Sequence, residues 1–339
     1  METNVPDRRV EWVDYARGIC IILVVMMHAT LGVEAAVGQE GWMHGVVAFF
    51  KPFRIPTFFL VAGLFAHRVI DRDWSIFFDK KVLRFAYFYI LWLTITFAFK
   101  LPGRIESEGL LAGLKLYLVA FVDPFGSLWF IYLLPIFFLA VRWTRTLPVA
   151  AVWLFAAALE IAPIETGWVV IDEFAARFVY FYTGHIIASW IFGAANGLSF
   201  ARALALIAAG GLLNFFCVQA GYADWPLVSL ALGFAGAAAI VAASVLVARE
   251  HLLSFFGYCG RISLMIYLSF FLPVATARLL LVHSGVIKDV GTISAIVTVA
   301  GVLGAIALYR LSLQTPLSFL FERPRAFRAD ELSAALLSR

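Results

Sequence analysis

Long apolar runs, separated by short polar or glycine- and proline-containing stretches, are the main pattern along the chain. A helix that crosses a bilayer needs roughly 20 largely apolar residues, and on this criterion the sequence predicts about ten spanning helices. They lie near residues 18–35, 46–66, 82–100, 127–142, 147–163, 175–193, 202–219, 226–248, 262–283 and 292–312. Segment 109–122 is too short to span, and we expect it to lie in the interface or to re-enter the membrane.

The composition agrees with this pattern. Hydrophobic residues make up 63% of the chain and charged residues 14%, whereas a soluble protein has about 45–50% apolar and about 25% charged residues. The mean hydropathy is +0.92. These values exclude a soluble enzyme, a disordered chain and a disulfide scaffold. We therefore predict an all-α, polytopic membrane bundle that forms a single transmembrane domain over residues 1–339, with tails at 1–9 and 313–339.

The distribution of cations predicts the orientation. An even number of spans places both termini on one side of the membrane. If the N-terminus is cytoplasmic, most of the 26 lysines and arginines fall on cytoplasmic segments. Both termini are therefore predicted to be cytoplasmic. The first span is not expected to be a cleavable signal peptide, because Asp14 and Arg17 enter it and no small-residue cleavage site follows. The three cysteines lack metal-ligand spacing, so no metal site is expected.

Three polar residues of the first span form the strongest candidate site. Asp14 and Arg17 are one helical turn apart and can pair on one face. His28 follows Arg17 by eleven residues, which returns it to within roughly 20° of that face and about 16 Å deeper. An intramembrane histidine is often only hydrogen-bonded to a neighbouring helix. The alignment with Asp14 and Arg17 favours a functional role for His28.

The second span contains two cations bracketed by prolines, Lys51-Pro52 and Arg54-Ile55-Pro56. Proline frees backbone carbonyls, and such a helix is tolerated where it lines protein or water. Lys51 is near enough to the outer end to extend to the headgroups. Arg54 is deeper and is expected to face a polar cavity, with Glu160 as a candidate counter-charge at a similar depth.

The inner loop after the second span is rich in cations, which either enforce topology or form an anion site for a phosphorylated substrate. Its basic residues are His67, Arg68, Arg72, Lys80, Lys81 and Arg84. Lys81 and Arg84 are one turn apart at the start of a predicted helix and are placed to grip a phosphate together.

Several of these segments together resemble a known family. The matching segments are Asp14-x-x-Arg17-Gly18 with His28, then Ile55-Pro56-Thr57-Phe58-Phe59-Leu60-Val61-Ala62-Gly63, Lys81-Val82-Leu83-Arg84, Leu128-Trp129-Phe130-Ile131, and Gly260-Arg261-Ile262-Ser263 to Tyr267-Leu268. In this order they are similar to the signatures of the membrane-bound acyltransferase family 3. The chain departs from the pattern in three places. Lys81 replaces an arginine, Phe270 stands where the family has a late histidine, and Val61-Ala62-Gly63 lacks the usual serine.

The resemblance implies transfer of an acyl group, of the acetyl or succinyl class, from cytoplasmic acyl-CoA to a hydroxyl of a glycan or lipid-linked sugar, such as O-acetylation of a polysaccharide. A positioned imidazole can take a proton from such a hydroxyl, so His28 is the candidate base, although it could instead carry the acyl group itself. Asp14 and Arg17 would position the helix and the donor. Arg54 would stabilise the oxyanion.

The expected donor contacts and setting complete this hypothesis. Arg68, Lys81 and Arg84 would hold the CoA phosphates. We expect no tightly bound cofactor and no nucleic-acid partner, and an integral protein of the bacterial cytoplasmic (inner) membrane. The main alternative is a proton-coupled secondary transporter that uses His28, Asp14 and Arg17 as a proton relay. A non-catalytic membrane scaffold is a third interpretation, and it predicts no dependence on His28.

Overall fold

The computed structural model describes residues 9–250, 252–324 and 327, and this part of the chain is helical with no strand. The elements in chain order are α1 (Glu11–Val37), α2 (Met43–Gly63), α3 (His67–Ile70), α4 (Trp74–Phe77), the π-helical turn η1 (Phe78–Leu83), α5 (Arg84–Glu108), α6 (Leu110–Val119), η2 (Gly126–Leu128), α7 (Trp129–Thr144), α8 (Val149–Ile161), α9 (Val169–Ile186), α10 (Ala188–Asn196), α11 (Phe200–Gln219), α12 (Val228–Arg249), α13 (Ser254–Arg261), α14 (Ser263–Ser269), α15 (Phe271–Ser284), α16 (Val290–Leu313) and η3 (Pro316–Leu320). The predicted all-α bundle is confirmed.

Every segment predicted to span the membrane is helical, but not every one is a single straight span. Among the described residues, seven helices are long and apolar enough to cross a membrane. The count rises to nine if two bent pairs, α9 with α10 at 68° and α14 with α15 at 50°, each form one span. The remaining predicted segment, 147–163, corresponds to α8, whose 13 residues cover only about 20 Å of a hydrocarbon core about 30 Å thick. The predicted number of about ten is therefore approximate.

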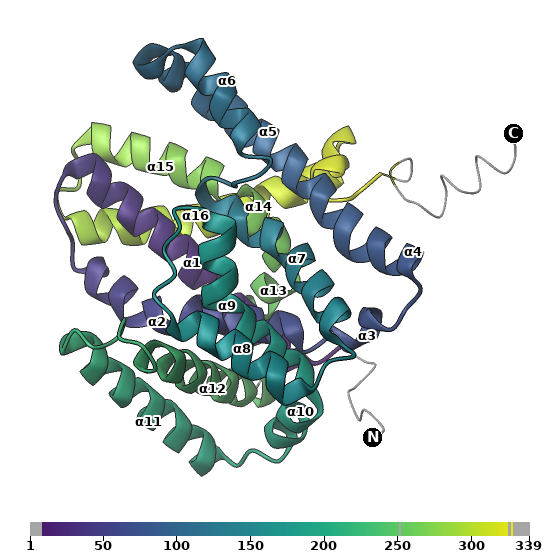
Figure 1. Cartoon of the computed structure of the whole chain (residues 1–339). Coiled ribbons are helices and arrows are strands. Elements are labelled where there is room, and N and C mark those ends of the chain that lie inside the picture. Colours follow the sequence, from purple (N-terminus) through teal and green to yellow (C-terminus); the bar gives the residue numbers. More distant parts are fainter. Residues whose placement is uncertain (1–8, 251, 325–326, 328–339) are drawn as a thin grey trace, which may run out of the picture.

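Segment 109–122 forms the short helix α6, which turns back along the end of α5 (Figure 1). Gly109 has a φ of 84°, a left-handed backbone conformation that favours glycine, and it allows the reversal between the two helices. The hydroxyls of Thr94 and Tyr117 lie 2.9 Å apart, and the rings of Phe97 and Tyr117 pack with their centroids separated by 4.7 Å. As predicted, α6 is too short to span a membrane.

Helix α1 lies inside the bundle and is contacted by α2, α12, α13, α14, α15 and α16 (Figure 1). Its sequence is apolar on nearly all sides, which is the pattern of a buried helix. The bundle has two ends. We call the end where α1 begins and α2 finishes the basic end, because Arg17, Arg68 and Lys81 line a common cavity there. The end where α1 finishes and α2 begins is called the opposite end.

Helix α2 passes through both of its prolines without breaking. Two polar side chains, one from α11 and one from α2 itself, donate hydrogen bonds to carbonyls in the first half of α2. Asn214 Nδ2, from α11, donates to the Phe49 carbonyl at 2.7 Å, and Arg54 Nη1 donates to the Val47 carbonyl at 3.3 Å. These contacts put polar protein groups beside the first half of α2, in agreement with the prediction that it lines protein. The carbonyls that Pro52 and Pro56 leave without a helical donor are different ones, those of Ala48 and Pro52.

Glycines bring α2 and α9 into close contact near the basic end. A Cβ at Gly63 would overlap the Phe181 carbonyl, and one at Gly184 would overlap the Leu60 carbonyl. Backbones that approach this closely are typical of helices packed in membranes through small residues. The C-terminal end of α9 therefore lies at the basic end, and its start at Val169 lies toward the opposite end.

The described part of the predicted tail 313–339 packs against α5 and does not project from the bundle. Tyr87 donates from its hydroxyl to the Phe319 carbonyl at 2.8 Å, and Trp92 Nε1 donates to the Leu320 carbonyl at 2.9 Å. Arg323 Nη2 forms an ion pair with Asp79 Oδ2 at 2.5 Å, and both side chains are 9% exposed. Residues 1–8, 325–326 and 328–339 of the predicted tails lie outside the described residues.

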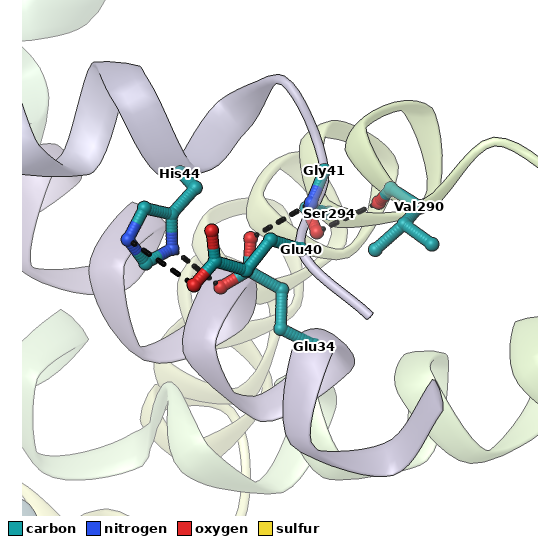
Figure 2. A network of polar contacts seen from close by, with 6 residues as sticks. All are labelled: Glu34, Glu40, Gly41, His44, Val290 and Ser294. Atoms are coloured by element: carbon teal, nitrogen blue, oxygen red, sulfur yellow. Dashed lines mark hydrogen bonds and ion pairs between the residues drawn. The ribbon is translucent and has the colours of Figure 1, made fainter. Parts of the chain in front are cut away.

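A cluster of polar contacts closes the opposite end where α1 connects to α2 (Figure 2). Glu34 accepts from the Gly41 backbone N–H at 3.1 Å and lies 2.9 Å from His44 Nδ1. Glu40 lies 3.8 Å from the other ring nitrogen of His44. The buried carboxylate of Glu34 thus binds both the connection between α1 and α2 and the first turn of α2. These contacts fix the ends of two helices that line the candidate site.

Candidate functional site

A cavity of about 490 Å³ opens at the basic end, and we call it the basic cavity. Its lining residues are Arg9, Val10, Val13, Asp14, Arg17, Phe65, Arg68, Val69, Lys81 and Arg261. Five of them are cations and one is an acid, so the cavity has an excess of positive charge. Such a concentration of cations in one concave surface attracts phosphate groups.

Close packing between α1 and α13 forms part of this cavity. A Cβ at Gly18 would overlap the Phe256 carbonyl, and one at Gly260 would overlap the Asp14 carbonyl. Only glycine permits this approach, which brings α13 close to α1. As a result Arg261, the residue after Gly260, lines the same cavity as Arg17.

Asp14 and Arg17 both line the basic cavity, but the ion pair that Asp14 forms is with a different residue. Its Oδ2 accepts from Arg9 Nε at 2.6 Å, and no ion pair between Asp14 and Arg17 is present in the described residues. The guanidinium of Arg17 instead lies 5.4 Å from the centroid of the Phe65 ring. The Arg68 guanidinium approaches the same ring at 4.5 Å, so Phe65 contacts two of the cavity's cations.

Lys81 and Arg84, predicted to act as a pair, take different positions. Lys81 lies on the π-helical turn η1, lines the basic cavity, and places its ammonium 4.1 Å from the centroid of the Phe138 ring. Arg84 begins α5, is exposed, and is not among the residues that line the basic cavity. A π-helical turn changes the register of the side chains that follow it, which the three-residue spacing alone does not reveal.

A second cavity, of about 180 Å³, lies beside His28, and we call it the central cavity. Its polar lining residues are His28, Arg54, Ser127, Glu173, Arg177 and Tyr267, and Trp129 and Phe130 contribute aromatic rings. The structure therefore brings His28 and Arg54, which the sequence singled out separately, to one cavity. The central cavity contains the kinds of polar groups that orient a ligand inside an otherwise apolar pocket.

His28 is held in place by packing. Its ring lies against Phe270, with the two centroids 5.3 Å apart. Among the described residues, neither ring nitrogen of His28 makes a hydrogen bond to another protein group. An imidazole that lines a cavity with its nitrogens unpaired is available to a ligand there. Phe270, which departs from the family pattern, thus contacts the candidate base directly.

Arg54 is 7% exposed and lies beside the central cavity. Its Nη1 donates to the Val47 carbonyl at 3.3 Å, its Nη2 contacts the sulfur of Met27, and its Nε has no partner in the described part of the chain. The predicted counter-charge is wrong: Glu160 accepts from the hydroxyls of Ser229 at 2.7 Å and Tyr180 at 3.3 Å, not from Arg54. A buried guanidinium without an acidic partner favours an anionic ligand or transition state.

Several lining residues of the two cavities were not predicted from the sequence. Arg9 extends from before the first helix, and Ser127 lies on a short turn, so periodicity does not identify either one. The sequence does contain a signal for Glu173 and Arg177, because an acid and a base four residues apart at the start of an apolar segment can pair on one face of a helix. Lys51 lies outside both cavities and pairs with Asp224 at 2.8 Å.

Comparisons with known proteins identify one relationship. A family model described as an acyltransferase domain, that of acyltransferase family 3, matches residues 10–310. No curated protein and no solved structure matches the chain. The matched region contains every lining residue of the central cavity and all but Arg9 of the basic cavity.

Proposed function

The chain belongs to the membrane-bound acyltransferase family 3 and is a membrane acyltransferase; from its two cavities we propose that it moves an acetyl- or succinyl-class group from acyl-CoA to a hydroxyl of a glycan or lipid-linked sugar. The observation that carries the proposal is that one helix, α1, contributes Arg17 to the basic cavity and His28 to the central cavity. The donor would bind at the first cavity and react at the second.

The basic cavity suits the nucleotide part of CoA. Coenzyme A carries a diphosphate and a further phosphate on its ribose, and clustered arginines bind phosphate through charge-assisted, bidentate hydrogen bonds. Arg17, Arg68, Lys81 and Arg261 supply these charges around one concave surface. The bias of lysines and arginines toward this end predicts that it faces the cytoplasm, where acyl-CoA is made. Arg84 lies outside the lining and would contribute through its longer-range charge.

The long pantetheine arm would carry the thioester from the basic cavity toward His28. Arg17 and His28 are separated by eleven residues of one helix, which corresponds to about 16 Å along its axis. This arm is narrow and uncharged, so it would pass among the side chains of the bundle, whereas the charged nucleotide would stay at the membrane surface. The thioester carbonyl would then lie in the central cavity.

In the reaction, His28 would take the proton of the acceptor hydroxyl as its oxygen attacks the thioester carbonyl. The tetrahedral oxyanion that forms would receive hydrogen bonds from the guanidinium of Arg54, which lines this cavity. The intermediate then expels the CoA thiolate, which takes the proton from the imidazolium. The balance is one ester formed, one thioester broken and one thiol released.

A covalent route uses the same residues. His28 would first attack the thioester to give an acyl-imidazole and CoA, and the acceptor hydroxyl would then displace the imidazole. Exchange of radiolabelled CoA into acetyl-CoA in the absence of an acceptor distinguishes the routes, because only the covalent route releases and recaptures CoA before an acceptor is added.

The proposal is tested with purified protein in nanodiscs and radiolabelled acetyl-CoA or succinyl-CoA. It predicts CoA release that depends on His28 and transfer of label to a hydroxyl acceptor. Absence of both, combined with a solute flux in proteoliposomes that is lost in His28→Ala, would support the transporter instead. Absence of any effect of His28→Ala in either assay would support a scaffold.

A further inference from the structure

An ion pair on α9 leaves most of its hydrogen-bonding capacity unused. Arg177 Nε donates to Glu173 Oε2 at 3.1 Å, and the two side chains are 27% and 28% exposed. In the described part of the chain, the two terminal nitrogens of Arg177 and the second oxygen of Glu173 make no hydrogen bond. Both residues line the central cavity. The pair therefore presents planar donors and an acceptor to whatever occupies that cavity.

The same cavity offers a free hydroxyl and an aromatic ring. Ser127 lines it with a hydroxyl that forms no hydrogen bond among the described residues, and Trp129 lines it with its indole. A sugar ring has hydroxyls along its rim and C–H groups on its faces. Carboxylate and guanidinium groups match two adjacent hydroxyls, and an aromatic ring covers a C–H face.

The size and position of the cavity limit what can enter. Its volume of about 180 Å³ is below the roughly 300 Å³ at which pockets for drug-sized ligands begin. One ring of a larger acceptor fits this volume better than a whole oligosaccharide. Glu173 is in the second turn of α9, toward the opposite end of the bundle, whereas the basic cavity lies at the other end. Glu173 therefore lies on the side of the central cavity that is away from the basic cavity.

We propose that Glu173 and Arg177, with Ser127 and Trp129, form the acceptor subsite and hold a single pyranose ring by two adjacent hydroxyls while a further hydroxyl faces His28. The inference rests on the proposed acyl transfer and specifies its acceptor. Glu173 and Arg177 are specificity-determining residues in this account, because they bind the part of the acceptor that does not react.

The test uses the full-length protein in nanodiscs with radiolabelled acetyl-CoA. The acceptor probes are the methyl glycosides of glucopyranose, galactopyranose and mannopyranose, the monodeoxy derivatives of any that react, and hexanol as a hydroxyl without a ring. At least one methyl glycoside is expected to take label, and hexanol is not. Removing either hydroxyl that the pair binds should lower kcat/KM by at least about tenfold, since a charged hydrogen bond is lost.

Variants separate recognition from structure. Glu173→Gln and Arg177→Gln should raise the KM for the reactive glycoside by at least about tenfold, with the KM for acetyl-CoA within twofold. Asp224→Asn, which removes the acid of the exposed Lys51–Asp224 pair, is the matched control and should change neither value. The swap Glu173→Arg with Arg177→Glu keeps an ion pair but exchanges donor and acceptor, so it should not restore use of the glycoside.

Two results would overturn the subsite. The first is restoration of glycoside use by the swapped pair, which would show that the pair only holds α9 in place. The second is CoA release that depends on His28 but is not increased by any methyl glycoside, with no label on any of them. The second result would leave the proposed acyl transfer standing, whereas loss of the proposed function itself would appear as CoA release that does not depend on His28.

Discussion

Arg17 and His28 lie on the same helix, α1, yet they line two different cavities. The helix is continuous from Glu11 to Val37, so the axial distance between the two side chains is fixed by helical geometry at about 16 Å. Arg17 lies in the cavity with excess positive charge, and His28 lies in the one that the guanidinium-bearing residue Arg54 lines. A single rigid element thereby relates a positively charged cavity to a candidate base.

The basic cavity, to which Arg17 and Arg261 both belong, depends on the contact between α1 and α13. Gly18→Ala should displace α13, because the added Cβ would overlap the Phe256 carbonyl, and both thermal stability and acyl-CoA binding should fall. Gly211→Ala is the matched control. Gly211 lies within α11 with nothing within 4 Å of an added Cβ, so alanine there should be neutral or slightly stabilising. Equal melting temperatures for the two variants in nanodiscs would contradict the packing account.

The different positions of Lys81 and Arg84 make a second prediction. Lys81→Ala should weaken acyl-CoA binding by about tenfold or more at low salt, whereas Arg84→Ala should weaken it less. The reason is that Lys81 lines the basic cavity and Arg84 does not. Isothermal titration at two salt concentrations measures both effects. A larger loss for Arg84→Ala would favour the pairing expected from the spacing of the two residues.

The buried pair of Asp79 and Arg323 should stabilise the protein only while both members are present. Asp79→Ala leaves the Arg323 guanidinium, 9% exposed, without its acid, and we expect a loss of about 3–5 kcal/mol in unfolding free energy. The double variant Asp79→Ala with Arg323→Met removes the uncompensated charge and should recover most of that loss. Denaturant titration measures the three values, and an unchanged stability in Asp79→Ala would refute the prediction.

Replacing Arg54 should lower activity without lowering stability. Replacing a buried cation that has no acidic partner among the described residues by methionine should leave thermal stability unchanged or higher. Loss of the oxyanion donor should lower kcat by about 10²–10³-fold, with little change in KM. Lys51→Met, at an exposed cation of the same helix, is the control. An unchanged kcat in Arg54→Met would remove Arg54 from the mechanism.

The sequence predicted the helical class because spanning helices need long apolar segments and few charges. It also singled out His28 and Arg54 separately, since ionisable groups inside a membrane protein avoid lipid, and the structure puts both on one cavity. Segment 147–163 was harder to interpret, because apolar composition does not reveal that α8 ends after 13 residues.

Contacts between distant segments were not predictable from spacing along one helix. Asp14 and Arg17 satisfy the spacing of a pair, but Arg9 reaches Asp14 from the preceding segment. Glu160 and Arg54 were matched by depth, although depth does not specify which face of a helix a side chain occupies. Ser229 and Tyr180, from two other helices, bind Glu160 instead.

The central claim is that His28 performs the proton transfer or carries the acyl group, and its most direct measurement is the rate of CoA release by His28→Ala in nanodiscs. His283→Ala, at an exposed histidine outside both cavities, is the control. The account predicts that His28→Ala lowers the rate by about 10²–10⁴-fold and that His283→Ala leaves it unchanged. A His28→Ala rate within twofold of the parent protein would contradict it.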